Sequence, residues 1–193
     1  MAIERPRRLL HASVILILFG SRYVLRCAEA YSNKRYHSES GYLMHFAIIG
    51  AGNMGCLYGS NLARIGQTVT MIDVWPEHVD AMSRDGLTMT GLHGDFVAPV
   101  AATTDPNAVD PADVAIILTS TNETASAAGI AATVLKDDGY ALTLQNGLGN
   151  VEQIDPILGE NRTMAGLSFH SADLTAPGHV THSNHGPTYI GER

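Results

Sequence analysis

The sequence of 193 residues predicts an α/β fold built on a doubly wound, mainly parallel sheet. Three observations lead to this prediction. From residue 44 onward, short apolar runs of strand length alternate with segments of helical character. The first run, 46–49, opens directly into a Gly-x-Gly-x-x-Gly turn at 50–55, and the second run, 68–72, ends at Asp73. The order of strand, glycine turn, helix, strand and acidic residue is typical of a Rossmann-like βαβ unit.

The glycine turn is the first candidate binding site. Gly50 is expected to make the tight turn, Gly52 to let a pyrophosphate approach the backbone, and Gly55 to let the helix pack closely on the strand. The helix that follows presents N–H groups and a partial positive charge to the phosphates. The bare pattern also fits a glycine-rich turn without special function, so the flanking elements decide for dinucleotide binding. The predicted phosphate-binding residues are Gly50, Ala51, Gly52, Asn53, Met54 and Gly55.

Asp73 lies where an acidic residue would bind the hydroxyls of the adenosine ribose, 23 positions after Gly50. A turn or helix-capping aspartate is the alternative interpretation. Its carboxylate would repel the 2′-phosphate of NADP, and no arginine follows it, because the next residues are Val74, Trp75 and Pro76. Electrostatics therefore favour NADH over NADPH.

The remaining elements follow from periodicity and turn residues. Residues 87–101 alternate like strands around two glycine turns, and we interpret them as a hairpin inserted in the sheet order, with His93 near its turn. The tail, 172–191, predicts two antiparallel strands joined by a turn that contains Gly, Asn and His. The other predicted elements are helices at 56–65, 76–84, 124–135 and 151–158, and strands at 113–118, 140–144 and 163–169.

Polar residues gather where two of these strands end. Thr119 and Ser120 follow the strand 113–118, and the segment 145–150 follows the strand 140–144. Ligands bind at the carboxyl ends of the strands in open α/β sheets. We therefore predict that Thr119 and Ser120 contact the cofactor.

Charge and cysteine content exclude several classes of function. Residues 1–43 hold seven Lys/Arg and three Asp/Glu, a net charge of +4. Because the whole chain has a net charge of −7, residues 44–193 have a net charge of −11. A body this acidic argues against nucleic-acid binding. Cys27 and Cys56 form neither a plausible disulfide pair nor a metal motif, which indicates a reducing, cytoplasmic location. His179, His182 and His185 recur at every third residue, a poor spacing for ligands on one strand, so no metal site is predicted.

The first 43 residues form a leader that we exclude from the fold. Arginines precede an apolar run too short to span a membrane, so no membrane association is expected. Three interpretations stay open: upstream sequence before a true start at Met44, an export signal, or an organelle-type leader. The leader is expected to be disordered or loosely helical, and 44–193 to form one dinucleotide-binding domain.

Three segments carry a family resemblance beyond the glycine turn. They are 50–66, the Leu-Gln-Asn-Gly-Leu-Gly-Asn stretch at 144–150, and 177–192, which begins Pro-Gly-His-Val-Thr-His. Together they resemble the N-terminal domain of ketopantoate reductases (2-dehydropantoate 2-reductases), across essentially all of 44–193. The stretch 144–150 is the specific part.

The resemblance implies hydride transfer from NADPH to 2-dehydropantoate, a 2-oxo acid, giving pantoate for pantothenate and coenzyme A synthesis. It also implies that Asn146 positions substrate and nicotinamide. In this family a C-terminal helical domain supplies the catalytic Lys and a substrate-binding Glu. The sequence ends at Arg193, about where that domain should begin, so we expect the chain to be the cofactor-binding half, completed by such a domain or by a homodimer partner.

Two departures from the family pattern keep other functions open. Ser120 stands where members often have Lys, and Asp73 with Val74 replaces a basic residue that would meet the 2′-phosphate. The alternatives are a free-standing nucleotide-binding module, one half of a split enzyme, or another NAD-dependent reductase of the same superfamily. The general acid is missing from the expected site, and His170, after a strand end, is the best substitute.

Overall fold

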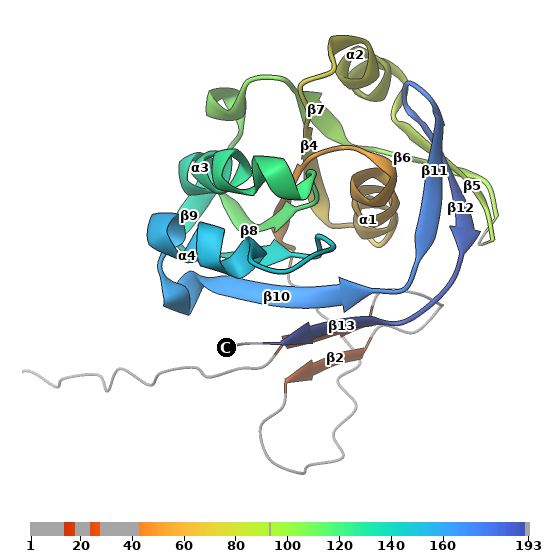
Figure 1. The fold of residues 1–193 in the computed structure, drawn as a ribbon. Helices are drawn as coiled ribbons and strands as arrows, with labels where there is room; N and C mark the ends of the chain where they lie inside the picture. The colour runs from red at the N-terminus through yellow and green to blue at the C-terminus, as the bar shows by residue number, and fades with distance from the viewer. Residues whose placement is uncertain (1–13, 18–23, 28–42, 93, 192–193) are drawn as a thin grey trace, which may run out of the picture.

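A computed structural model describes residues 14–17, 24–27, 43–92 and 94–191 (Figure 1). The main sheet has seven strands in the order β13-β10-β9-β8-β3-β4-β7. All neighbouring strands are parallel except β10 and β13, which pair antiparallel at one edge. The strands are β3 (His45–Ile49), β4 (Thr68–Ile72), β7 (Ala101–Thr103), β8 (Ala112–Ile117), β9 (Leu135–Thr143), β10 (Thr163–Ser168) and β13 (Thr188–Gly191). The predicted fold class, including its antiparallel C-terminal edge, is confirmed.

The four predicted helices form, although the first begins at Asn53, three residues before its predicted start. Gly66, with φ 87°, follows the first helix; Pro76 opens the second, and Gly86, with φ 80°, ends it. The α-helices are α1 (Asn53–Arg64), α2 (Pro76–Asp85), α3 (Thr124–Val134) and α4 (Asn150–Leu158). Short 3-10 turns are η1 (Pro106–Ala108), η2 (Thr121–Glu123) and η3 (Glu160–Arg162). No helix in the described ranges is long and apolar enough to cross a membrane.

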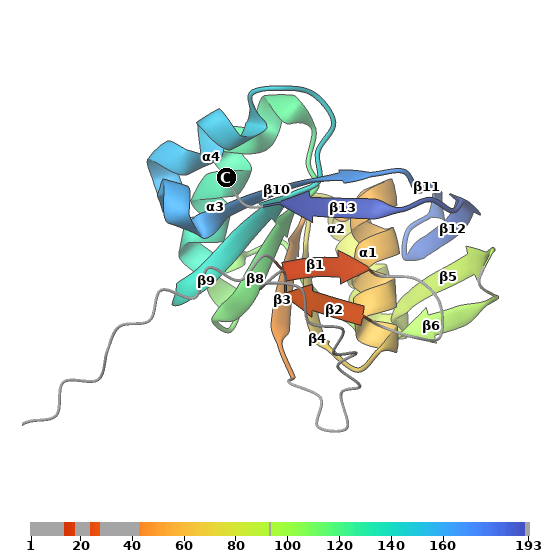
Figure 2. The same cartoon turned by 90° about the horizontal axis from the view of Figure 1, so that it is seen from below.

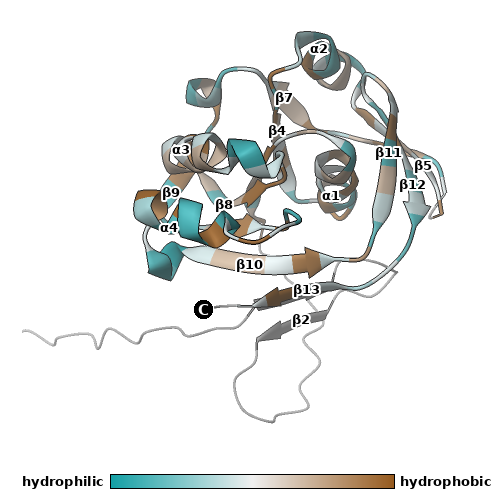
Figure 3. Ribbon diagram, viewed as in Figure 1, coloured by the Kyte–Doolittle hydropathy of each residue, from teal (hydrophilic) through white to brown (hydrophobic). Residues whose placement is uncertain are grey.

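Each face of the main sheet has its own hydrophobic core. Ile48 and Met71 point to the face that α1 covers, whereas Ile49 and Ile117 point to the face covered by α3 and α4. Alternation along the strands separates the two sets. Central strands such as β8 are among the most hydrophobic parts of the ribbon, and α2 carries hydrophilic residues on its outer side (Figure 3). Burial on both faces explains the continuous apolar runs in the sequence.

A second, four-stranded sheet covers α1 from the other side, in the order β11-β12-β5-β6 (Figure 2). Its strands are β5 (Leu87–Gly91), β6 (Phe96–Ala98), β11 (Ser171–Ala176) and β12 (His179–Asn184). The predicted hairpin forms, since β5 and β6 pair antiparallel, but its insertion in the main sheet was wrong. Instead β5 pairs with β12, almost a hundred residues later, and 101–103 form the edge strand β7 of the main sheet. Strand periodicity does not specify such long-range partners.

The predicted two-stranded tail was also wrong. Residues 171–191 form three strands divided between both sheets: β11 and β12 pair around Gly178, and β13 crosses to β10. The segment with Asn184, His185 and Gly186 is therefore a crossover and not a hairpin turn. Within the leader, β1 (Val14–Ile17) and β2 (Val24–Cys27) pair antiparallel, which differs from the disordered or helical state expected there. Both segments are rich in β-branched and apolar residues, which favour strands. His93 lies outside the described residues.

Candidate functional site

The candidate site lies where the strand order reverses. The chain runs from β3 outward through β4 to β7, and then returns to place β8 on the other side of β3. Neighbouring strand ends are joined by backbone hydrogen bonds: Gly50 N donates to Ile72 O, and Leu118 N to Ile49 O, both at 2.9 Å. In open α/β sheets the ligand-binding crevice lies at such a switch point, outside the carboxyl ends of the strands. The glycine loop and the segment after β8 border it.

The three glycines of the loop face three different environments. Gly50 has φ 92°, and a Cβ there would lie 2.9 Å from Thr119 N. A Cβ on Gly55 would collide with Gly50 O, so the helix packs directly on the turn. A Cβ on Gly52 would meet nothing within 4 Å. Gly50 and Gly55 are thus required by packing, whereas Gly52 leaves open space beside the backbone, as a pyrophosphate would need.

The amino end of α1 offers donors to an anion. Gly52 is its N-cap, no side chain caps it, and no acidic residue lies in the first turn. The first intrahelical bond runs from Cys56 N to Gly52 O at 2.9 Å, which leaves the N–H groups of residues 53–55 without helical acceptors. The Asn53 side chain is used within the protein, since its Oδ1 accepts from Leu174 N at 2.9 Å. Asn53 can therefore offer its backbone N–H to a phosphate.

Asp73 sits directly beside the glycine loop. Its Oδ2 accepts from Ala51 N at 2.7 Å and its Oδ1 from Trp75 N at 3.0 Å. The carboxylate is partly exposed, and each oxygen keeps a lone pair for a ribose hydroxyl. The geometry thus brings the predicted acidic residue to the predicted loop.

A buried Cys–His pair supports the loop from below. Gly178 N donates to His78 Nδ1 at 2.9 Å, so the ring carries its proton on Nε2, which donates to Ala51 O at 2.9 Å. The Cys56 thiol donates to the same oxygen at 3.0 Å. Burial, and secondarily the Asp73 carboxylate, raise the pKa of Cys56 to about 12, so the thiol is neutral. Both polar groups of the Ala51 backbone are thus used within the protein, and Ala51 supports the loop.

Gln145 joins the two polar loops that follow β8 and β9. Its Nε2 donates to Thr119 O at 3.0 Å and to Ser120 O at 3.2 Å, and its Oε1 accepts from Thr143 Oγ1 at 3.0 Å. The sequence analysis did not single out Gln145. The sequence does show an amide at the end of one strand and hydroxyl residues at the end of the neighbouring strand. It does not show that they bond, because the partners lie some 25 residues apart in the sequence.

Asn146 is held by its backbone. Its carbonyl oxygen accepts from Thr121 Oγ1 at 2.9 Å and from Asn150 Nδ2 at 3.2 Å. The residue is exposed, so its side-chain amide stands on a fixed backbone at the edge of the crevice. Asp73, the glycine loop, Thr119 and Asn146 therefore form one continuous row of contacts. Asp73 bonds Ala51 N, Gly50 lies against Thr119, and Gln145, the neighbour of Asn146, bonds Thr119 O.

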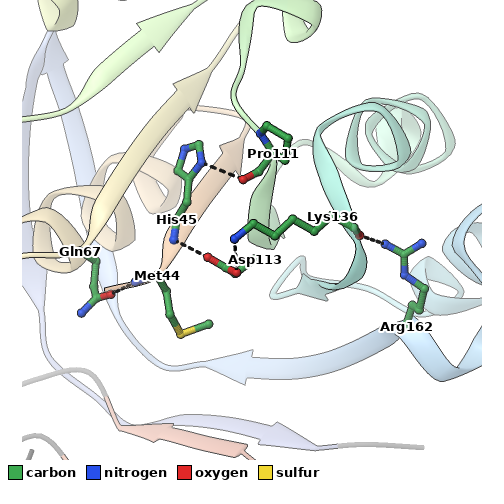
Figure 4. A network of polar contacts seen from close by, with 7 residues as sticks. All are labelled: Met44, His45, Gln67, Pro111, Asp113, Lys136 and Arg162. Atoms are coloured by element: carbon green, nitrogen blue, oxygen red, sulfur yellow. Dashed lines mark hydrogen bonds and ion pairs between the residues drawn. The ribbon is translucent and has the colours of Figure 1, made fainter. Parts of the chain in front are cut away.

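Lys136 lies at the amino end of β9, whereas the glycine loop follows the carboxyl end of β3. Figure 4 shows its contacts. Its Nζ pairs with Asp113 Oδ1 at 2.6 Å, at the amino ends of β8 and β9. Asp113 Oδ2 accepts from His45 N at 2.8 Å, and Arg162 donates to Lys136 O at 2.6 Å. This ion pair ties strand starts together and has no part in the crevice.

The histidines of the tail divide into two groups. His170 and His182 are buried, with Nδ1 and Nε2 3.3 Å apart, and the His185 ring lies 5.1 Å from His170. His179 is exposed on β12. His170 also packs edge-on against Tyr58 of α1, so its ring is buried in the interior although the residue follows the carboxyl end of β10. No group of three or more His, Cys, Asp or Glu within the described chain is arranged to hold a metal.

Comparison with known proteins identifies a family. The family model described as ketopantoate reductase PanE/ApbA matches residues 46–193. Curated 2-dehydropantoate 2-reductases from Halobacterium salinarum and Pyrococcus horikoshii are 34% and 35% identical to the chain. The matches cover 77% of this chain in both cases, and 49% and 47% of the two relatives. The chain thus spans about half the length of the curated relatives it matches.

Solved structures agree with this assignment. A PanE/ApbA family ketopantoate reductase from Ralstonia eutropha superposes with a TM-score of 0.69 at 35% identity, over 74% of this chain and 47% of that one. A D-mandelate dehydrogenase solved with NADH and anilino(oxo)acetate gives a TM-score of 0.69 at 27% identity, over 76% and 47%. The chain belongs to the ketopantoate reductase PanE/ApbA family.

Proposed function

We propose that this chain is the cofactor-binding half of an NADH-dependent reductase that converts a 2-oxo acid into a 2-hydroxy acid. By family membership the first candidate substrate is 2-dehydropantoate, reduced to pantoate. The observation that carries the proposal is the continuous row from Asp73 through the glycine loop and Thr119 to Asn146, along the switch-point crevice.

The residues fit a dinucleotide in order along this row. The open backbone at Gly52 and the free N–H groups of 53–55 suit the pyrophosphate. Asp73 suits the adenosine ribose. Asn146 suits the nicotinamide and substrate end, because an amide can both donate to and accept from a carboxamide or a hydroxyl. When bound, the dinucleotide supplies the hydride.

The preference for NADH rests on charge. The Asp73 carboxylate, with Glu77 exposed in the first turn of α2, makes this end of the crevice unfavourable for a 2′-phosphate. The same two features favour a second candidate, a related NAD-dependent reductase of another 2-oxo acid. The D-mandelate dehydrogenase in the comparison was solved with NADH, which supports that alternative. Ser120, exposed where the resemblance places a Lys, points the same way.

Calorimetric titration of the purified chain with NADH and NADPH tests the proposal. NADH is expected to bind more tightly. NADPH binding ten-fold more tightly, a difference of ~1.4 kcal/mol, would overturn the preference. Absence of binding by either cofactor would overturn dinucleotide binding itself. For the substrate, 2-dehydropantoate and phenylglyoxylate should be compared for their ability to tighten NADH binding, and the better one identifies the class of 2-oxo acid.

A further inference from the structure

Trp75 occupies an unusual position for a large apolar side chain. It follows Asp73 by two residues and is 41% exposed. One face of its indole stacks on the buried His78 ring, with centroids 5.3 Å apart and planes 24° apart. Because the His78 ring covers that face, the exposed surface of Trp75 lies on the rest of the residue. The chain therefore presents a flat, apolar surface next to the ribose-binding carboxylate.

Trp75 is held at its backbone and on one face of its ring. Its backbone N donates to Asp73 Oδ1 at 3.0 Å, and its carbonyl oxygen accepts from Val79 N at 3.1 Å as α2 begins. The His78 ring beneath it is fixed at both nitrogens, between Gly178 N and Ala51 O. The same imidazole therefore supports both the glycine loop and the indole. A rigid aromatic surface loses little conformational entropy when a ligand stacks on it.

We propose that Trp75 is the adenine-binding platform of the dinucleotide site, with the purine stacked on the indole face opposite His78. This inference rests on the proposed function, since it assigns the base to a site whose ribose and pyrophosphate are assigned above. The position is consistent with the covalent order of the cofactor: pyrophosphate at the loop, ribose at Asp73, base two residues farther on. A purine has two apolar faces and needs no charge, which matches an exposed indole.

The chain offers a direct readout, because Trp75 is its single tryptophan. Selective excitation of indole fluorescence therefore reports on this one ring. ADP-ribose and AMP, which contain adenine and lack nicotinamide, are expected to quench the emission saturably. Nicotinamide mononucleotide, which lacks adenine, is expected to leave it unchanged. Equal responses to both kinds of probe would overturn the assignment.

Substitutions give the second test. Trp75→Ala is expected to weaken ADP-ribose binding by roughly five-fold to a hundred-fold in calorimetry, as loss of a base–aromatic stack does. Trp75→Phe should recover part of the affinity, because it keeps a ring. Tyr189→Ala removes an exposed aromatic ring from β13 at the far edge of the sheet and should not change binding. The melting temperature of each variant separates loss of stacking from loss of folding.

The outcomes separate the two proposals. If NADH binds the unaltered chain but Trp75→Ala binds ADP-ribose equally well, the platform is wrong and the dinucleotide site stands. If neither NADH nor ADP-ribose binds the unaltered chain, the dinucleotide site itself is wrong, and the platform fails with it.

Discussion

At the scale of single residues, Asp73 has a structural role in addition to the ribose-binding role proposed for it. Its carboxylate joins the backbone of the glycine loop to that of the segment before α2, through Ala51 N and Trp75 N. The sequence analysis placed it near the ribose from its spacing to Gly50, and the structure brings it to the loop. The structural role was not predictable from spacing, because it depends on how β4 ends relative to β3.

Asp73→Asn should change cofactor preference with limited damage to the fold. Asn keeps one acceptor oxygen but removes the charge that opposes a 2′-phosphate. We expect the ratio of NADH to NADPH affinity to fall by roughly ten-fold, measured by calorimetry. Asp73→Ala should shift the ratio similarly but also lower the free energy of unfolding by about 1–3 kcal/mol, since two backbone donors lose their acceptor. An unchanged ratio in both variants would remove Asp73 from the ribose site.

Alanine at two glycines of the loop should affect different properties, stability at Gly55 and cofactor binding at Gly52. Gly55→Ala drives a Cβ into Gly50 O, a backbone atom that cannot yield, so it should destabilise the fold by at least ~2 kcal/mol. Gly52 has φ −71°, which alanine adopts freely, and its Cβ site is open. Gly52→Ala should leave the melting temperature nearly unchanged and weaken NADH binding. The control is Gly129→Ala on the exposed side of α3, which should stabilise by about 0.5–1 kcal/mol without affecting NADH.

The raised pKa of the buried Cys56 thiol should make the stability of the fold depend on pH in the alkaline range. Its folded-state pKa of about 12 lies above the ordinary cysteine value of 9.0, so the folded chain holds the thiol proton more tightly than the unfolded chain. This contribution is fully present below pH 9.0 and is lost as pH rises towards about 12. In a Cys27→Ser background, denaturant melts should show less alkaline loss of stability for Cys56→Ala than for the parent. Parallel pH profiles for the two proteins would contradict this contribution.

At the scale of elements, the Gln145 side chain connects the ends of β8 and β9. The sequence predicted that these two loops are neighbours, because the carboxyl ends of parallel strands lie on the same side of a sheet. Which side chain joins them was not predictable, because Thr119, Ser120 and Gln145 are all polar residues at strand ends. The same limit applied to the tail. Alternation indicated strands but could not assign β12 to β5 or β13 to β10, since pairing depends on the packing of α1 between the two sheets.

Gln145→Ala should loosen the support of Asn146. It removes donors to Thr119 O and Ser120 O and the acceptor for Thr143 Oγ1, at a cost of about 1–3 kcal/mol in the free energy of unfolding. Gln145→Glu should cost more, because it turns a carboxylate towards two carbonyl oxygens. Both should weaken NADH binding while leaving AMP binding within two-fold, roughly the reproducibility of such titrations. Equal losses for NADH and AMP would show general damage to the crevice instead.

At the scale of the whole molecule, the main sheet differs chemically between the amino ends and the carboxyl ends of its strands. The carboxyl ends of the strands carry the glycine loop, amides and hydroxyls. The amino ends carry the Lys136–Asp113 ion pair (Figure 4). Reduction of a 2-oxo acid creates an alkoxide that must receive a proton from a nearby acid. After residue 43 the sequence contains one lysine, Lys136, and it lies at the amino ends of the strands, away from the glycine loop. We therefore expect the proposed cofactor binding to be measurable separately from proton transfer in this chain.

The chain is accordingly expected to bind NADH without oxidising it at a measurable rate when 2-dehydropantoate is added. The physical reason is that the groups proposed to hold the cofactor, the Asp73 carboxylate and the side chains of Thr119, Ser120 and Asn146, include no acid that can protonate an alkoxide. Absorbance of NADH over time gives the rate, with the longer relative from Halobacterium salinarum as the positive control. Adding the separately expressed C-terminal half of that relative should restore turnover if an acid is all that is lacking. Turnover by the chain alone, retained in Lys136→Ala, would mean that a crevice side chain or a bound water acts as the acid.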